Sequence, residues 1–369
     1  MGDSGEIAFI LGTRPEIIKM SPIIRECQRC GLDFVLIHTE QHHKYEMDKI
    51  FFEDLHLPAP QFRLGVGSGT HGQQTALLLS RIEKVLLEEK PEVVLVQGDT
   101  NTVLGGALVA AKLCIPVGHV EAGLRSYDRR MPEELNRILA DHMSDYLFAP
   151  TEQAKEILLG EGIASKSVFM TGNTIVDAVQ QNLEIAQENC DPLEKHHLTP
   201  QGYIVVTAHR PENVDQKDNL RDLLSALDLV QRELAIPLIY PLHPRTESML
   251  RRFGLGISSN VKVTKPLGFL EFLRLEAQAA LVLTDSGGMQ EEACILGVPC
   301  VTLRYSTERP ETVAVGANLL AGIEPERVLS CVRQMLGKKR GWPNPFGDGR
   351  SGERIVKLII SEQHQGRVH

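Results

Sequence analysis

Three acidic residues stand where predicted strands end or a predicted helix begins, and carboxylates in such places can transfer protons in a reaction. Asp99 follows an apolar strand at residues 92–96, and Glu121 follows the next strand, at residues 117–120. Glu133 lies at the start of the helix after that. Parallel strands bring their carboxyl ends to one edge of a sheet, where ligands bind. We therefore expect the three acids to share a pocket, although Asp99 taken alone would also serve as a helix cap.

Basic and small residues at the beginnings of helices predict a phosphate site. Arg14 and Lys19 lie about one turn apart at the start of the first helix, where the helix dipole favours an anion. Residues 284–292 lead from a strand through Ser-Gly-Gly into a helix that carries Glu292. Backbone amides there would face a phosphate, and the acid would accept hydrogen bonds from sugar hydroxyls. Arg309 adds a further cation, while solvated surface charges are the alternative for Arg14 and Lys19.

Two histidines follow predicted strands in the second half of the chain. His209 comes just after the strand at residues 203–207 and is followed by Arg210, and His243 comes after the strand at residues 238–240. A lone histidine is most often structural. An imidazole beside a guanidinium at the end of a strand instead indicates contact with a ligand.

Two patterns resemble cofactor motifs without completing them. Residues 67–72 match GxGxxG, but residues 58–63 before them make a poor strand, so a mobile loop is the better interpretation than NAD binding. His119 and Glu121 have the spacing of a zinc-deaminase signature, but Cys300 lacks the second cysteine that the signature needs. We therefore predict no metal and no dinucleotide cofactor.

The elements that would position these residues are short apolar strands separated by helices. The first series of strands is predicted at residues 7–12, 34–38, 92–96, 117–120, 146–149 and 168–170, and the second at residues 203–207, 238–240, 261–264, 280–283 and 300–303. Strands that are apolar throughout belong to parallel sheets covered on both faces. We predict an α/β fold of two doubly wound Rossmann-like domains with a central cleft. Residues 1–172 would form a domain carrying the acids, residues 173–352 a second Rossmann-like domain with the predicted phosphate site, and residues 353–369 a helix that packs back on the first domain.

Length and composition agree with a two-domain enzyme. The chain has 369 residues, more than one domain usually contains. Its 48 acidic and 39 basic side chains give a net charge of −9, which argues against a nucleic-acid partner. Apolar runs are too short to span a membrane, and the first residues do not read as a secretory signal. Seven scattered cysteines are typical of a protein in the reducing cytoplasm.

Seven motifs occur in the order typical of one enzyme family: GTRPEIIKMSPII, VQGDTNTV, HVEAGLRS, MPEELNR, TAHRPEN, TDSGGMQEEA and TERPE. The chain resembles the non-hydrolysing UDP-N-acetylglucosamine 2-epimerases from about residue 7 to residue 322. The resemblance implies a glycosyltransferase-B-like fold, a homodimer and a place in polysaccharide biosynthesis. It also implies interconversion of UDP-N-acetylglucosamine and UDP-N-acetylmannosamine without metal or nicotinamide.

Matching the motifs one by one implies three groups of residues. The catalytic residues would be Asp99, Glu121, Glu133 and His209. The residues that bind the UDP-sugar would be Arg14, Lys19, Arg210, Phe272, Ser286, Gly287, Gly288, Glu292 and Arg309. A second UDP-N-acetylglucosamine, bound as an activator, would contact Gln41, His42 and His243.

The stereochemistry of such a substrate explains why several acids are needed. The hydrogen at C2 is not acidic, but it is axial and opposite to the axial UDP, so that anti elimination of UDP to 2-acetamidoglucal is open. Syn re-addition then yields the manno product. Alternatives that the residues leave open are an epimerase for a modified UDP-sugar such as a diacetamido uronic acid, a hydrolysing 2-epimerase that releases N-acetylmannosamine, a glycosyltransferase of the same fold, and a non-catalytic sensor.

Overall fold

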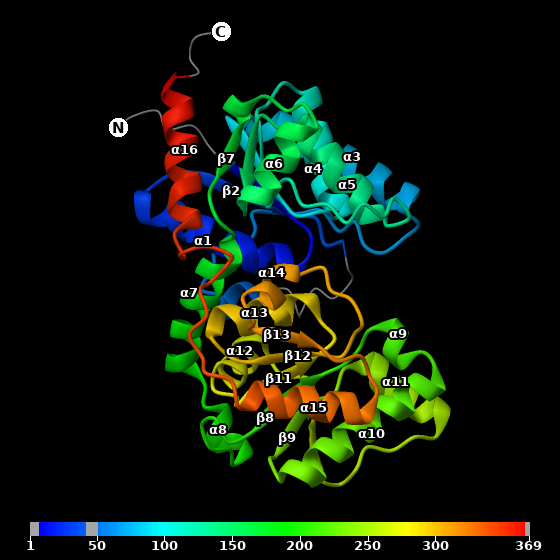
Figure 1. The fold of residues 1–369 in the computed structure, drawn as a ribbon. Coiled ribbons are helices and arrows are strands. Elements are labelled where there is room, and N and C mark those ends of the chain that lie inside the picture. Colours follow the sequence, from blue (N-terminus) through cyan, green and yellow to red (C-terminus); the bar gives the residue numbers. More distant parts are fainter. Residues whose placement is uncertain (1–6, 42–50, 366–369) are drawn as a thin grey trace. The chain divides into compact units, whose positions relative to one another are not determined.

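The chain folds into two compact units, shown as a ribbon in Figure 1. A computed structural model describes residues 7–41 and 51–365, with side chains as far as Glu362. Unit 1 consists of Met1–Gln181 and Phe346–His369, and unit 2 of Asn182–Pro345. In the described ranges, none of the helices combines the length and the apolar character needed to cross a membrane.

Unit 1 is built on a seven-stranded parallel sheet with the order β3-β2-β1-β4-β5-β6-β7. Its strands are β1 (Ile7–Leu11), β2 (Phe34–His38), β3 (Phe62–Arg63), β4 (Val93–Gln97), β5 (Val117–Val120), β6 (Tyr146–Ala149) and β7 (Val168–Met170). Its helices are α1 (Arg14–Cys30), α3 (His71–Glu89), α4 (Asn101–Lys112), α5 (Pro132–Met143), α6 (Glu152–Gly160), the 3-10 turn η1 (Ser165–Ser167), the first part of α7 (Thr174–Asn189) and α16 (Ser351–Gln365). The strand order reverses between β1 and β4, which is where ligands bind in such sheets.

Unit 2 repeats this plan with six parallel strands in the order β10-β9-β8-β11-β12-β13. The strands are β8 (Ile204–Thr207), β9 (Leu238–Pro241), β10 (Val261–Thr264), β11 (Leu281–Thr284), β12 (Cys300–Thr302) and β13 (Asn318–Leu320). The helices are α8 (Pro192–His196), α9 (Pro211–Val214), α10 (Lys217–Leu234), α11 (Pro244–Phe253), α12 (Phe269–Ala277), α13 (Gly287–Leu296), α14 (Pro310–Ala314) and α15 (Pro325–Leu336). The order reverses between β8 and β11. Two doubly wound Rossmann-like units confirm the predicted fold class.

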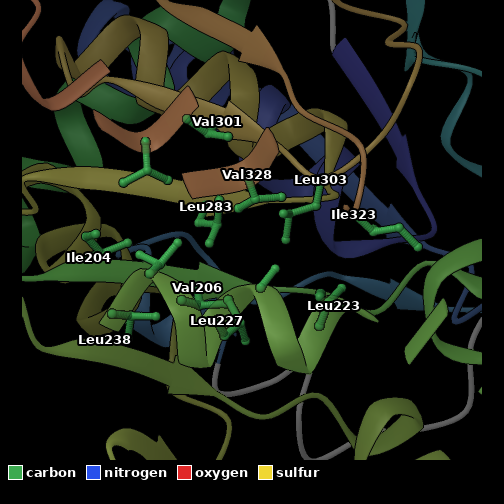
Figure 2. Packing of buried hydrophobic residues seen from close by; sticks show 14 of the residues in the cluster. Ile204, Val206, Leu223, Leu227, Leu238, Leu283, Val301, Leu303, Ile323 and Val328 are labelled. Atoms are coloured by element: carbon green, nitrogen blue, oxygen red, sulfur yellow. The ribbon is translucent and has the colours of Figure 1, made fainter. Parts of the chain in front are cut away.

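Buried aliphatic side chains between sheet and helices hold unit 2 together. Figure 2 shows Ile204 and Val206 of β8 packed with Leu223 and Leu227 of α10. On the same side of the sheet, Val328 of α15 adds to the cluster. Burying each such side chain contributes about 1.5–3 kcal/mol. A rigid sheet therefore supports the loops that follow β8 and β11.

The units divide at other residues than the 172/173 and 352/353 boundaries suggested by the sequence. The division falls after Gln181, inside α7, and before Phe346. The segment before α7 is bound to unit 1 by a hydrogen bond from the Asn173 backbone N–H to the Phe346 carbonyl (2.9 Å). The Asp177 carboxylate accepts another from the Gly352 N–H (2.9 Å). Helix α16 packs on α1 within unit 1, where the two ribbons lie side by side (Figure 1).

Two strands were not predicted, because each is too short to show a pattern. Strand β3 has only two residues, which pair with the end of β2, and it lies within residues 58–63, which the sequence indicated to be a poor strand. Strand β13 has three residues and pairs with β12 at the edge of its sheet. The GxGxxG segment leads into α3, which begins at His71 and is capped by Thr70.

Candidate active site

The loop between β1 and α1 is held by a buried acid, Glu16. One oxygen of its carboxyl group accepts hydrogen bonds from the backbone N–H groups of Gly12 (2.5 Å) and Thr13 (3.3 Å), and the other accepts from the Thr100 hydroxyl (2.6 Å). Burial raises the pKa of Glu16 to about 7, although these hydrogen bonds act to lower it. Gly12 has no room for a side chain, because a Cβ would lie 2.1 Å from Thr102 Oγ1. Glu16 thus ties the β1–α1 loop to the β4–α4 loop.

Glu121 follows β5 in a backbone conformation that is uncommon for any residue except glycine, with φ of 69°. Its carboxylate is buried, and Lys19 Nζ lies 2.7 Å from Oε1 and 2.6 Å from Oε2. The Gln97 side chain donates a further hydrogen bond to Oε2. Strained residues of this kind cost of order 1–3 kcal/mol and cluster at functional sites. Lys19, which the resemblance assigns to UDP, is therefore also part of the immediate surroundings of Glu121.

Asp99 and the acids at the start of α5 have different surroundings. Asp99 is about one-third exposed and accepts a hydrogen bond from the Arg137 guanidinium, while its backbone carbonyl accepts one from Asn136 Nδ2 (2.9 Å). Glu133 is exposed on the first turn of α5. The next residue, Glu134, is buried and accepts from Arg137 and from two backbone N–H groups of the preceding loop. The acid at position 133 thus faces solvent within unit 1, and its neighbour fixes Arg137.

The remaining predicted residues of unit 1 lie at the ends of β1 and β2. The Arg14 guanidinium is 5.7 Å from the centre of the Phe51 ring, within the range of a cation–π contact. Gln41 is buried, and its side-chain oxygen accepts hydrogen bonds from the Thr102 backbone N–H (3.1 Å) and hydroxyl (2.8 Å). His42 lies outside the described residues.

In unit 2, the turn that carries His209 is held by Asp285, a fully buried acid after β11. Its carboxylate accepts hydrogen bonds from the backbone N–H groups of His209 (2.9 Å) and Arg210 (2.9 Å) and from Asn213 Nδ2 (3.1 Å). His209 Nδ1 is 3.4 Å from Asp285 Oδ1. The rings of His209 and His243 lie 5.0 Å apart, at 31°. Burial and the charges of His209 and Arg245 lower the pKa of His243.

The N-terminus of α13 combines backbone amides with a cation and an acid. A Cβ on Gly287 would lie 3.7 Å from Glu308 Oε2 and 3.9 Å from Arg210 Nη2, while a Cβ on Gly288 would meet open space. Glu308 also forms an ion pair with Arg304 (2.7 Å). Hydrogen bonds from Arg304 lower the pKa of Glu308 to about 2, so that it is ionised at neutral pH. This helix end carries the groups that a diphosphate needs, with a carboxylate at the same place.

Four further predicted residues of unit 2 line α12, α13 and the loop before α14. Ser286 precedes the first residue of α13, and Glu292 is half-buried further along that helix. Phe272 of α12 packs at the edge of the apolar cluster beneath α13. Arg309 Nε lies 2.7 Å from Glu291 Oε1. Phe272 thus follows β10, Ser286 and Glu292 follow β11, and Arg309 follows β12.

Four buried acids that hold the loops around predicted site residues were missed from the sequence: Glu16, Glu134, Asp141 and Asp285. Glu16, Glu134 and Asp285 lie inside the quoted motifs, next to residues that were singled out. Such an acid can be recognised in the sequence because it stands at the end of an apolar strand or at the start of a helix. An acid that is buried there needs a partner. Among the described residues, no group of three or more histidine, cysteine or acidic side chains could hold a metal ion.

Two Rossmann-like units, one with acids after β4 and β5 and the other with a helix start suited to an anion after β11, fit the class of enzymes that act on nucleotide-linked sugars. A family model described as UDP-N-acetylglucosamine 2-epimerase matches residues 25–360. The chain belongs to the UDP-N-acetylglucosamine 2-epimerase family, and its fold is the glycosyltransferase-B-like fold of the solved 2-epimerases.

Individual relatives agree over nearly the full length. The UDP-N-acetylglucosamine 2-epimerase of Methanocaldococcus jannaschii is 56% identical over 360 residues, which cover 96% of this chain and 98% of that protein. A crystal structure of the M. jannaschii enzyme in complex with UDP-GlcNAc and UDP matches with a TM-score of 0.86, covering 96% of this chain and 99% of the other. The UDP-2,3-diacetamido-2,3-dideoxy-D-glucuronate 2-epimerase of Pseudomonas aeruginosa is 42% identical over 96% of this chain and 99% of its own length.

Proposed function

We propose that this chain catalyses the reversible epimerisation of UDP-N-acetylglucosamine at C2, with UDP-N-acetylmannosamine as the product. The observation that carries the proposal is the pair of acids at the switch point of unit 1, Asp99 and Glu121, with Lys19 on Glu121. The 56% identity to an enzyme named for this substrate supports it. The reaction would proceed by anti elimination of UDP to 2-acetamidoglucal, followed by syn re-addition.

Asp99, Glu121 and Glu133 would divide the proton transfers. Removal of the C2 proton on one face and return of a proton on the other require a base and an acid, and each such group typically contributes about 10²- to 10⁴-fold to the rate. The strained backbone and the three hydrogen bonds at Glu121 support a fixed catalytic orientation for it. Asp99, with its carboxylate one-third exposed, retains access to a substrate.

UDP would bind to the beginning of α13 and to the cations near it. Bare amides at Gly287 and Gly288 suit the diphosphate, and Glu292 suits the ribose hydroxyls. Phe272 would contact the uracil. The other UDP-binding residues would be Arg14, Lys19, Ser286 and Arg309. His209 and Arg210 would stabilise the negative charge that grows on the departing UDP, and the buried Asp285 supports that role by fixing the turn that carries both.

We also propose four properties that accompany this reaction. A second UDP-N-acetylglucosamine would act as an activator at Gln41, His42 and His243. The enzyme would be a homodimer; large apolar side chains are exposed on one face of α5, including Leu135 and Leu139, and patches of this kind mark interaction sites. Light scattering on the wild type and on Leu139→Glu tests the dimer.

A cytoplasmic location agrees with seven cysteines that are all free, and the product would enter polysaccharide biosynthesis.

Incubation with UDP-N-acetylglucosamine in deuterated water tests the reaction. We expect deuterium at C2 of both UDP-sugars, together with a loss of at least about 10²-fold in Glu121→Gln, which should still bind UDP. Release of free N-acetylmannosamine would instead identify a hydrolase. The 42% identity to the diacetamido-uronate epimerase supports one alternative substrate, the UDP-linked diacetamido uronic acid. The same assay is therefore run with that UDP-sugar, and a larger kcat/KM for it would reassign the substrate.

A further inference from the structure

His119 lies in β5 with its imidazole fully buried, two residues before Glu121. Its Nδ1 is 2.7 Å from Asp141 Oδ1, and its Nε2 is 2.8 Å from the backbone carbonyl oxygen of Gly98. Both ring nitrogens therefore face oxygen atoms at hydrogen-bond distance. Gly98 immediately precedes Asp99 in the β4–α4 loop.

Both of these oxygens act as acceptors. A peptide carbonyl has no proton to donate. The Asp141 carboxylate on α5 also accepts hydrogen bonds from Arg125 Nη1 (2.6 Å) and from the Gly123 N–H (3.2 Å), and these donors stabilise its ionised form. A neutral imidazole has a single N–H and would leave one nitrogen lone pair against an oxygen lone pair in a site without water access.

Asp141 and Glu121 act on the His119 ring, and Arg125 acts on Asp141. Asp141 and Arg125 are almost completely buried, and Arg125 also pairs with Glu161 (2.6 Å), so that acidic and basic groups alternate from the surface inwards. Glu121 is the second acid that acts on the ring. Burial acts to lower the pKa of His119, but attraction to Asp141, the two hydrogen bonds and Glu121 together raise it.

We infer that His119 is a protonated positioning residue, whose imidazolium fixes the Gly98 carbonyl group and with it the backbone of Asp99. The Gly98 N–H donates to the Val120 carbonyl (3.2 Å), so this residue is held through its N–H by β5 and through its carbonyl oxygen by the ring. Gly98 has φ of 88°, a conformation that this residue type alone adopts easily. The cation also stands beside the acids that carry out proton transfer. The role of Asp99 rests on the proposed function; the protonation state of His119 does not.

Nuclear magnetic resonance on protein labelled with ¹⁵N-histidine tests the inference without any assay of activity. We expect both ring nitrogens of His119 to carry a proton at pH 7.5. The resonances are assigned by their loss in His119→Gln. One protonated and one bare nitrogen at pH 7.5 would overturn the inference, even if the enzyme epimerises its substrate.

A kinetic experiment separates positioning from a merely structural role. In Asp141→Asn the ring loses its counter-ion, so its pKa falls and kcat should acquire a decline as the pH rises through that lowered value. Asp145→Asn is the matched control, since Asp145 accepts a hydrogen bond from Val117 N (2.9 Å) at the other end of β5. We expect about 10²-fold lower kcat in His119→Gln at pH 8 with UDP affinity kept within about threefold. Equal losses of kcat and UDP affinity, or a pH profile of Asp141→Asn like that of Asp145→Asn, would reject a positioning role.

Discussion

Removal of the Asp285 side chain should destabilise the turn that carries His209 and Arg210. Asp285 is fully buried, and Asp285→Ala deprives two backbone N–H groups and the Asn213 amide of their acceptor. Asn213 retains the Leu303 carbonyl (3.0 Å), so the two N–H groups of His209 and Arg210 bear most of the loss. At about 1–3 kcal/mol for each buried donor left without a partner, we expect about 3 kcal/mol of destabilisation.

Thermal unfolding and steady-state kinetics measure the effect. For a unit of this size about 3 kcal/mol corresponds to a Tm lower by about 6–12 °C. Because His209 and Arg210 would no longer be held in place, kcat should fall by about 10²-fold. Asp285→Asn keeps one oxygen acceptor, so its Tm and kcat should lie between those of the wild type and those of Asp285→Ala. The matched control is Asp222→Ala, whose carboxylate is exposed on α10 and should matter by less than about 0.5 kcal/mol. If Asp285→Ala melted and turned over like the control, the assigned role of this acid would be wrong.

Three other substitutions test separate contacts. Lys19→Met leaves the buried Glu121 carboxylate without its cation and should cost about 3 kcal/mol in urea unfolding, together with most of the activity; unchanged stability would argue against this ion pair. Glu308→Gln removes the carboxylate that lies beside Arg210 at the start of α13, so UDP should bind several-fold more tightly by calorimetry, whereas weaker binding would mean that Glu308 assists the ligand. Glu16 has a pKa raised from 4.5 to about 7 in the folded chain. Its contribution to stability is thus complete below about pH 4.5 and is lost as the pH rises through about 7. Urea midpoints of the wild type should fall relative to those of Glu16→Gln between pH 5 and pH 7.5, and parallel midpoints would contradict this.

The sequence predicted the strands well because their apolar runs report burial on both faces of a sheet. Once the strands are known, so are the edges of the two sheets, where Asp99 and Glu121 must lie in unit 1 and His209 in unit 2. The partners of these residues could not be read in the same way. Lys19 and Glu121 are 102 positions apart, and only the folding of unit 1, in which α1 packs on β4 next to β5, brings the ammonium to the carboxylate.

The acids at the start of α5 illustrate a second limit. Glu133 and Glu134 are adjacent in the sequence, but successive residues of a helix point about 100° apart, so that one is exposed and the other buried. The apolar residues Leu135 and Leu139 lie on the exposed face of this helix, so its sequence pattern indicates the wrong face as the buried one. Helix α7 poses a similar problem. Nothing in its sequence marks the position, after Gln181, at which one compact unit ends and the other begins.

Positional isotope exchange tests the central claim most directly, because it reports cleavage of the bond between the sugar and UDP. UDP-N-acetylglucosamine is prepared with oxygen-18 in the bridge between C1 and the β-phosphate, incubated with the enzyme and recovered for ³¹P resonance analysis. Elimination followed by re-addition predicts that the label moves into non-bridging positions of the β-phosphate while deuterium from the solvent enters C2. Deuterium at C2 with the label retained in the bridge would contradict the account, since inversion would then occur without release of UDP.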